Sequence, residues 1–142
     1  MSRIILYSFL SVSSFLDIRT RRIPAWISLL FGMLSLVFAV FFQRTGILDL
    51  LFSALPGAVF AALSIATEGK LGMADALAMV IIGLLKGWED AAIIILYALM
   101  GASILSAGLL IIKKRGRNHE IPFLPFLMAG ALIQEVTACF FL

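Results

Sequence analysis

The fold is decided by residues 90–112, which read DAAIIILYALMGASILSAGLLII, and by the basic run KKRGR that follows at 113–117. A helix needs about 20 apolar residues to cross a hydrocarbon core of roughly 30 Å, and this stretch is long enough. Basic residues directly after an apolar run are typical of its cytoplasmic end. We interpret the run as stop-transfer charge and not as a nucleic-acid patch, because no aromatic residues are interleaved with it.

The rest of the chain repeats this pattern of apolar runs and short charged clusters. Of its 142 residues, 63% are hydrophobic and 13% are charged, and a soluble domain of this size could not hide so much apolar surface. Unpaired backbone groups are too costly in lipid, and the alternation typical of a transmembrane barrel is absent, so the runs predict helices.

We therefore predict an all-α polytopic membrane protein with about six transmembrane helices in one membrane-embedded domain, residues 1–142. The predicted spans are residues 4–16, 24–42, 47–66, 75–86, 90–112 and 121–141. The first and fourth spans are short. Either the bilayer thins around them or their ends are buried in protein.

The lysines and arginines predict the orientation. With the N-terminus outside, eight of the eleven lie on the cytoplasmic side and three on the other side, which is a clear positive-inside bias. We predict a multi-pass protein of the cell (inner) membrane. A cleaved signal peptide at residues 1–16 fits less well, because its positive cluster follows the apolar run instead of preceding it. The cytoplasmic residues are Arg19, Arg21, Arg22, Lys70, Lys113, Lys114, Arg115 and Arg117, and the outer ones are Arg3, Arg44 and Lys86.

Acidic residues at a membrane edge or inside a membrane are candidate functional residues, because placing a charge there costs free energy. Asp17 ends the first predicted span and Asp75 opens the fourth, so both are expected at the cytoplasmic edge. Two carboxylates distant in sequence but equal in depth can meet between helices, which is the minimum geometry of an aspartyl protease. Each also has a simpler interpretation: Asp17 can pair with a neighbouring arginine, and Asp75 can be the N-cap of the fourth helix.

Two adjacent carboxyls suffice for peptide hydrolysis. Their charges repel, and apolar surroundings disfavour ionisation, so the pair shares a proton. The ionised partner can then activate a water while the protonated partner donates toward the peptide carbonyl. Ahead of Asp75 lies a predicted loop, residues 68–74, whose Gly69 and Gly72 permit close approach of a backbone to a carboxylate.

Three stretches resemble motifs of the type IV prepilin peptidases, a family of GxGD-type aspartyl membrane proteases. SFLDIRTRRIP at 14–24 resembles the first catalytic segment, and GKLGMAD at 69–75 resembles the second. IPFLPF at 121–126 is similar to the motif that opens the family's last helix. The resemblance implies that Asp17 and Asp75 are the catalytic pair and that Gly72, Met73 and Ala74 form the active-site loop.

The resemblance also implies a reaction: cleavage of the short leader of prepilin-like precursors at the cytoplasmic face, with no cofactor. Longer members carry paired Cys-x-x-Cys motifs and methylate the new N-terminus, whereas this chain has one cysteine, Cys139. We expect a short form without the methyltransferase domain. Such short forms serve type IV pili of the Flp/Tad kind or archaeal-type filaments, whose assembly is related to protein secretion. With His119 as its only histidine, the chain predicts no metal site.

Some residues depart from the family pattern and leave alternatives open. Ala74 and Leu124 stand where the family has glycine, and Ala76-Leu77 replace a hydrophobic-lysine pair. The chain could accordingly have a divergent specificity or be a non-catalytic assembly relative. A small transporter or channel subunit using Glu135 is a further alternative, although Glu135 lies about 21 Å along the last helix and nearer the outer face. The oligomeric state stays open.

Overall fold

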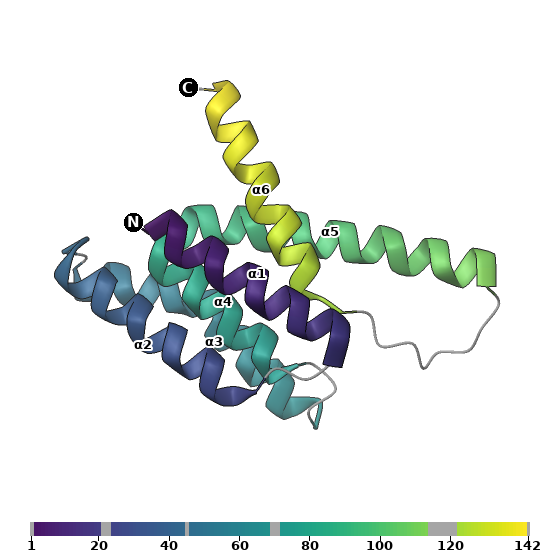
Figure 1. Cartoon of the computed structure of the whole chain (residues 1–142), viewed down its shortest axis with the longest axis horizontal. Helices are drawn as coiled ribbons and strands as arrows, with labels where there is room; N and C mark the ends of the chain where they lie inside the picture. The colour runs from purple at the N-terminus through teal and green to yellow at the C-terminus, as the bar shows by residue number, and fades with distance from the viewer. Residues whose placement is uncertain (1, 21–23, 45, 69–71, 114–121, 142) are drawn as a thin grey trace.

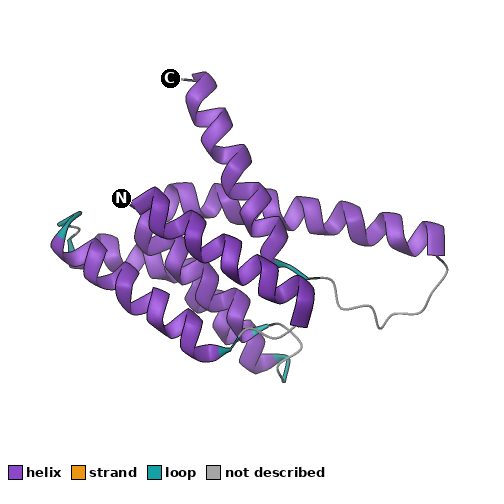
Figure 2. Ribbon diagram, in the orientation of Figure 1, coloured by secondary structure: helices purple, strands orange, loops and turns teal. Residues whose placement is uncertain are grey.

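The computed structural model describes residues 2–20, 24–44, 46–68, 72–113 and 122–141. Within these ranges the chain forms six helices and no strand, which confirms the all-α prediction (Figure 2). The helices are α1 (Ser2–Thr20), α2 (Ala25–Phe41), α3 (Ile47–Ala66), α4 (Met73–Lys86), α5 (Trp88–Lys113) and α6 (Leu124–Phe141). Their bounds lie within a few residues of the predicted spans, because a helix is the only way for such apolar runs to pair their own backbone in lipid.

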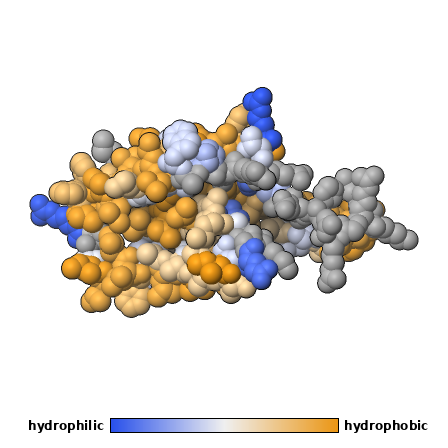
Figure 3. All heavy atoms as spheres, turned by 90° about the horizontal axis from the view of Figure 1, so that it is seen from below, coloured by the Kyte–Doolittle hydropathy of each residue, from blue (hydrophilic) through white to orange (hydrophobic). Residues whose placement is uncertain are grey.

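The surface of the molecule is that of a membrane protein. Among the described residues, α3, α6 and residues 88–112 of α5 are long and apolar enough to cross a membrane, and α2 is apolar but shorter. Large hydrophobic side chains are exposed along these helices, and Figure 3 shows them covering most of the visible face. So much exposed apolar area needs lipid or protein around it. Whether α1 and α4 also cross the membrane stays a prediction.

Helix α4 is the centre of the bundle and explains the short fourth span. It packs against α1, α2, α3 and α5. Most of its residues are buried: Ala76, Ala78, Met79, Ile81, Ile82, Gly83, Leu84 and Leu85. This burial agrees with the expectation that the ends of a short span lie against protein, since Leu84 and Leu85 near the C-terminal end of α4 are buried.

Two glycines let α3 and α4 come into backbone contact. A Cβ built on Gly57 of α3 would lie 2.7 Å from the Val80 backbone nitrogen and 2.8 Å from the Ala76 carbonyl oxygen. A Cβ on Gly83 of α4 would overlap the Ser53 carbonyl oxygen. Small residues at helix interfaces allow this approach in membranes, where packing replaces the hydrophobic effect as the driving force.

The directions of the helices decide which helix ends lie at the same end of the bundle. Helices α1 to α5 alternate in direction, so the C-terminal end of α1 lies beside the N-terminal end of α4 (Figure 1). Helix α6 packs against α5 and α1, and its C-terminal part then leaves the bundle (Figure 1). This arrangement brings the ends that carry Asp17 and Asp75 together.

Candidate active site

Asp17 lies in the last turn of α1 and not in a loop after it. The helix continues to Thr20, past the predicted end of the first span at residue 16. The Thr20 hydroxyl donates to the Leu16 carbonyl at 2.7 Å, and Arg19 provides the positive charge favoured at a helix C-terminus. The helical backbone thus fixes the direction of the Asp17 side chain.

Asp75 lies in the first turn of α4. The N-cap of this helix is Gly72, so the simpler interpretation of Asp75 as the N-cap is wrong. Met73 and Ala74 are the first two residues of α4, and the prediction that they form a loop is corrected. The buried residues of α4 begin at Ala76, directly after Asp75. The helix therefore starts before its buried part, within the GKLGMAD stretch at 69–75.

Gly72 touches the Asp75 carboxyl group. A Cβ built on Gly72 would lie 2.9 Å from Asp75 Oδ2 and 3.3 Å from its Cγ, closer than ordinary contacts. Gly72 has a φ of −62°, which any residue can adopt. The glycine therefore provides space beside the Asp75 carboxylate and is not needed for an unusual turn.

The two aspartates lie at helix ends, outside the four apolar helices, and they interact. Burial, and to a smaller extent the negative charge of Asp17, together raise the pKa of Asp75 from 3.8 to about 7. Burial also raises the pKa of Asp17, but less of that side chain is buried. Residues 58 positions apart in the sequence thus form one coupled pair, and such a pair titrates as a unit.

A backbone group of α6 distinguishes the two carboxyls. The Leu124 N–H donates to Asp17 Oδ2 at 3.4 Å, and this contact lowers the pKa of Asp17 against the effect of burial. Leu124 is the first residue of α6, where N–H groups have no partner within the helix. Sequence reasoning singled out the Ile-Pro-Phe stretch but missed this donor, which only the packing of α6 on α1 reveals.

The sequence model of the type IV leader peptidase family matches residues 4–112. The chain belongs to this family. The matched segment contains both aspartates and ends before α6, so the Leu124 contact lies outside it. Searches among curated proteins and among solved structures found no match. Membership of this leader peptidase family agrees with the resemblance seen in the three motifs and implies aspartic-type prepilin peptidase activity in general terms.

The remaining predicted residues fall in three groups. Gly69, Lys70, Arg21, Arg22 and His119 lie outside the described residues. Glu68 is exposed at the end of α3 and takes a left-handed backbone conformation, φ 55°. Glu135 forms ion pairs with Lys86 and Arg3, as expected for an acid that a neighbouring helix stabilises.

Within the ranges that the structure describes, no group of three or more His, Cys, Asp or Glu side chains could hold a metal ion.

Proposed function

We propose that this protein is an aspartyl endopeptidase that removes the short leader of type IV prepilin-like precursors. The observation that carries the proposal is that Asp17 and Asp75 lie at one end of the bundle and interact there: burial and repulsion raise the pKa of Asp75 to about 7, so that this carboxyl still holds a proton in about half of the molecules at neutral pH. Membership of the leader peptidase family supports the same reaction class.

The unequal surroundings assign a role to each carboxyl. Asp17 receives the Leu124 N–H and is the ionised partner, so it takes a proton from the attacking water. Asp75 is more buried and is the protonated partner, so it donates its proton to the peptide carbonyl oxygen as the water adds. When the tetrahedral intermediate collapses, Asp17 gives the proton that it took from water to the leaving amine, Asp75 takes back the proton of the former carbonyl oxygen, and the C–N bond breaks as the C=O bond re-forms.

The position of the pair suits a substrate that is half soluble and half membrane-embedded. Asp17 and Asp75 lie at the ends of α1 and α4, outside the long apolar helices. A leader could reach them from water while the apolar helix of the precursor stays in lipid. The eight-to-three distribution of basic residues supports a cytoplasmic position for this end, with the N-terminus outside. The substrates that we propose are precursors of Flp/Tad-type or archaeal-type filaments.

The test is co-expression with a prepilin-like precursor from the same genome, followed by gel shift and N-terminal sequencing. We expect wild type to cleave, and both Asp17→Asn and Asp75→Asn to leave the precursor intact while remaining folded in membranes. Asp49→Asn is the matched control, because Asp49 is an exposed acid in the first turn of α3. Cleavage that survives either substitution would refute the two-carboxyl mechanism.

A further inference from the structure

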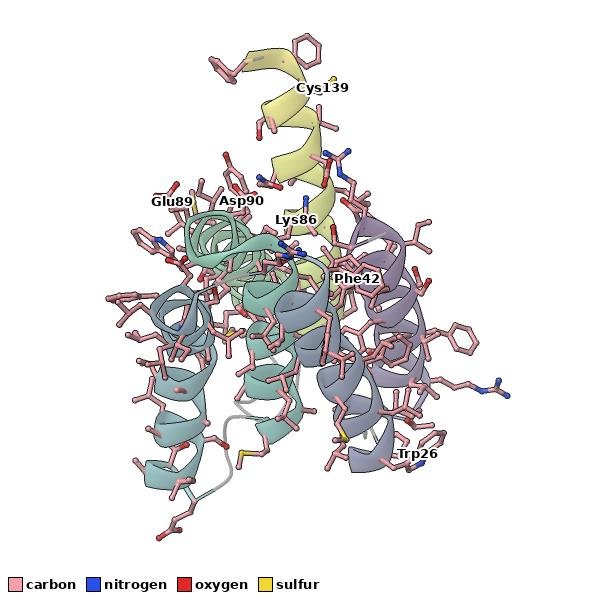
Figure 4. All side chains as sticks on the ribbon, turned by 90° about the vertical axis from the view of Figure 1, so that its left-hand side faces the viewer. Trp26, Phe42, Lys86, Glu89, Asp90 and Cys139 are labelled. Carbon is pink, nitrogen blue, oxygen red and sulfur yellow. The ribbon has the colours of Figure 1, made fainter. Side chains whose placement is uncertain are left out.

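A second polar cluster lies at the end of the bundle opposite to the aspartates. Lys86, the last residue of α4, donates to Glu135 of α6, and Arg3 of α1 approaches the same carboxylate at 3.3 Å. The Lys86 side chain is 11% exposed and that of Glu135 is 20% exposed, whereas that of Arg3 is 73% exposed. Figure 4 shows Lys86 near Glu89 and Asp90 at one end of the helices and Trp26 at the other.

This cluster joins α6 to the two helices that carry the aspartates. Helix α6 contacts α1 in two further places, through the Leu124 N–H on Asp17 and through the Tyr7 hydroxyl, which donates to the Ala131 carbonyl at 3.3 Å. From Leu124 to Glu135 the helix rises about 16 Å at about 1.5 Å per residue. One rigid element therefore connects the ion pairs with the hydrogen bond at Asp17.

Beyond Glu135 the helix has little contact with the rest of the protein. Val136 is 56% exposed, and Phe140 and Phe141 are 87% and 91% exposed. The ion pairs are thus the last polar contacts of α6 before it leaves the bundle (Figure 1). In surroundings poor in water, separating the two charges leaves each of them without compensation, which costs free energy. The ion pairs therefore stabilise α6 in this register.

We propose that Glu135 is a positioning residue: by pairing with Lys86 and Arg3 it holds α6 in the register that places the Leu124 N–H against Asp17. This inference rests on the proposed peptidase function of the aspartate pair and assigns a role to α6, which lies outside the matched family segment. A slip of α6 by one residue moves Leu124 by about 1.5 Å, enough to break a hydrogen bond.

The kinetic test compares Glu135→Gln with the matched control Glu89→Gln, an exposed acid at the same end of the bundle. We expect Glu135→Gln to lower kcat about tenfold or more with KM within about twofold, because misplacement of a catalytic group acts on the chemical step. Exchange of the charges, Lys86→Glu with Glu135→Lys, should restore most of kcat. A Glu135→Gln enzyme with wild-type kcat, or a charge exchange that restores nothing while the protein stays folded, would overturn the proposal.

A cross-linking test needs no substrate and separates this inference from the proposed function. In a Cys139→Ala background, cysteines are placed at positions 17 and 124, because the Leu124 backbone nitrogen lies 3.4 Å from the Asp17 side chain, and the rate of disulfide formation reports how closely α6 stays beside the end of α1. Adding Glu135→Gln should slow the reaction severalfold, and adding Glu89→Gln should not. Equal rates in all three proteins would refute the role of Glu135 even if wild type cleaves precursors. Slowing by Glu135→Gln alone would support it even if wild type cleaves nothing, and the failure would then lie with the proposed function.

Discussion

Replacement of Asp75 by asparagine should abolish cleavage and also stabilise the protein at neutral and alkaline pH. Asp75 has an ordinary pKa of 3.8, which the folded protein raises to about 7 by burial and by repulsion from Asp17. One pKa unit corresponds to about 1.4 kcal/mol. The rise to about 7 therefore costs the folded state about 4 kcal/mol once Asp75 is ionised.

The sign of the pH dependence follows from proton binding. Because the folded state holds its proton more tightly, it binds more protons than the unfolded state between pH 3.8 and about 7. Stability is therefore highest below pH 3.8 with respect to this group and falls as pH rises to about 7, where the full penalty is reached. Asparagine does not titrate, so Asp75→Asn removes this loss.

The assay is thermal unfolding of purified protein in one detergent, from about pH 5 to about pH 8, where the carboxyl passes from protonated to ionised. We expect the Tm of Asp75→Asn to exceed that of wild type at both ends of this range, with a difference about twice as large at about pH 8 as at about pH 5. Asp49→Asn, which changes an exposed carboxyl, should follow wild type at every pH. A Tm difference between Asp75→Asn and wild type that does not grow with pH would refute the burial argument.

Further predictions concern glycines and the reaction itself. Gly72→Ala should lower kcat about tenfold or more, because the added methyl displaces the Asp75 carboxyl. Gly46→Ala is the control and should leave kcat unchanged: Gly46 is the N-cap of α3, and a Cβ built there would lie 3.6 Å from its nearest atom, an ordinary contact. Gly83→Ala should destabilise the protein by about 1–3 kcal/mol, because the added methyl overlaps the α3 backbone. Gly32→Ala is the control and should leave the stability unchanged, because a Cβ built on Gly32 meets open space; thermal unfolding measures both variants. Cleavage by wild type should fall as pH rises through about 7, as the acid Asp75 loses its proton, and a rate that is flat from about pH 6 to about pH 9 would contradict the assigned role.

The helices themselves could be predicted from the sequence, because their cause is local. Each apolar run must satisfy its backbone within itself in lipid, and the predicted span at residues 47–66 agrees with α3 at both ends. Two of the errors lie where polar motifs continue a helix. Helix α1 runs past Asp17 to Thr20, and α4 begins at Met73 inside the predicted loop, because helical backbone bonds extend beyond the apolar core.

The identity of the two aspartates was also within reach of the sequence, since charge in an apolar chain is rare and two acids at one membrane edge point to a pair. The difference between the surroundings of the two carboxyl groups could not be predicted from the sequence. The Leu124 N–H on Asp17 and the ion pairs of Glu135 join residues far apart in the chain, and nothing in the local sequence specifies such partners. Only the packing of α6 against α1 and α5, which brings Glu135 beside Lys86 of α4, decides them. The central place of α4 has the same origin, since apolar composition does not tell a helix surrounded by protein from one surrounded by lipid.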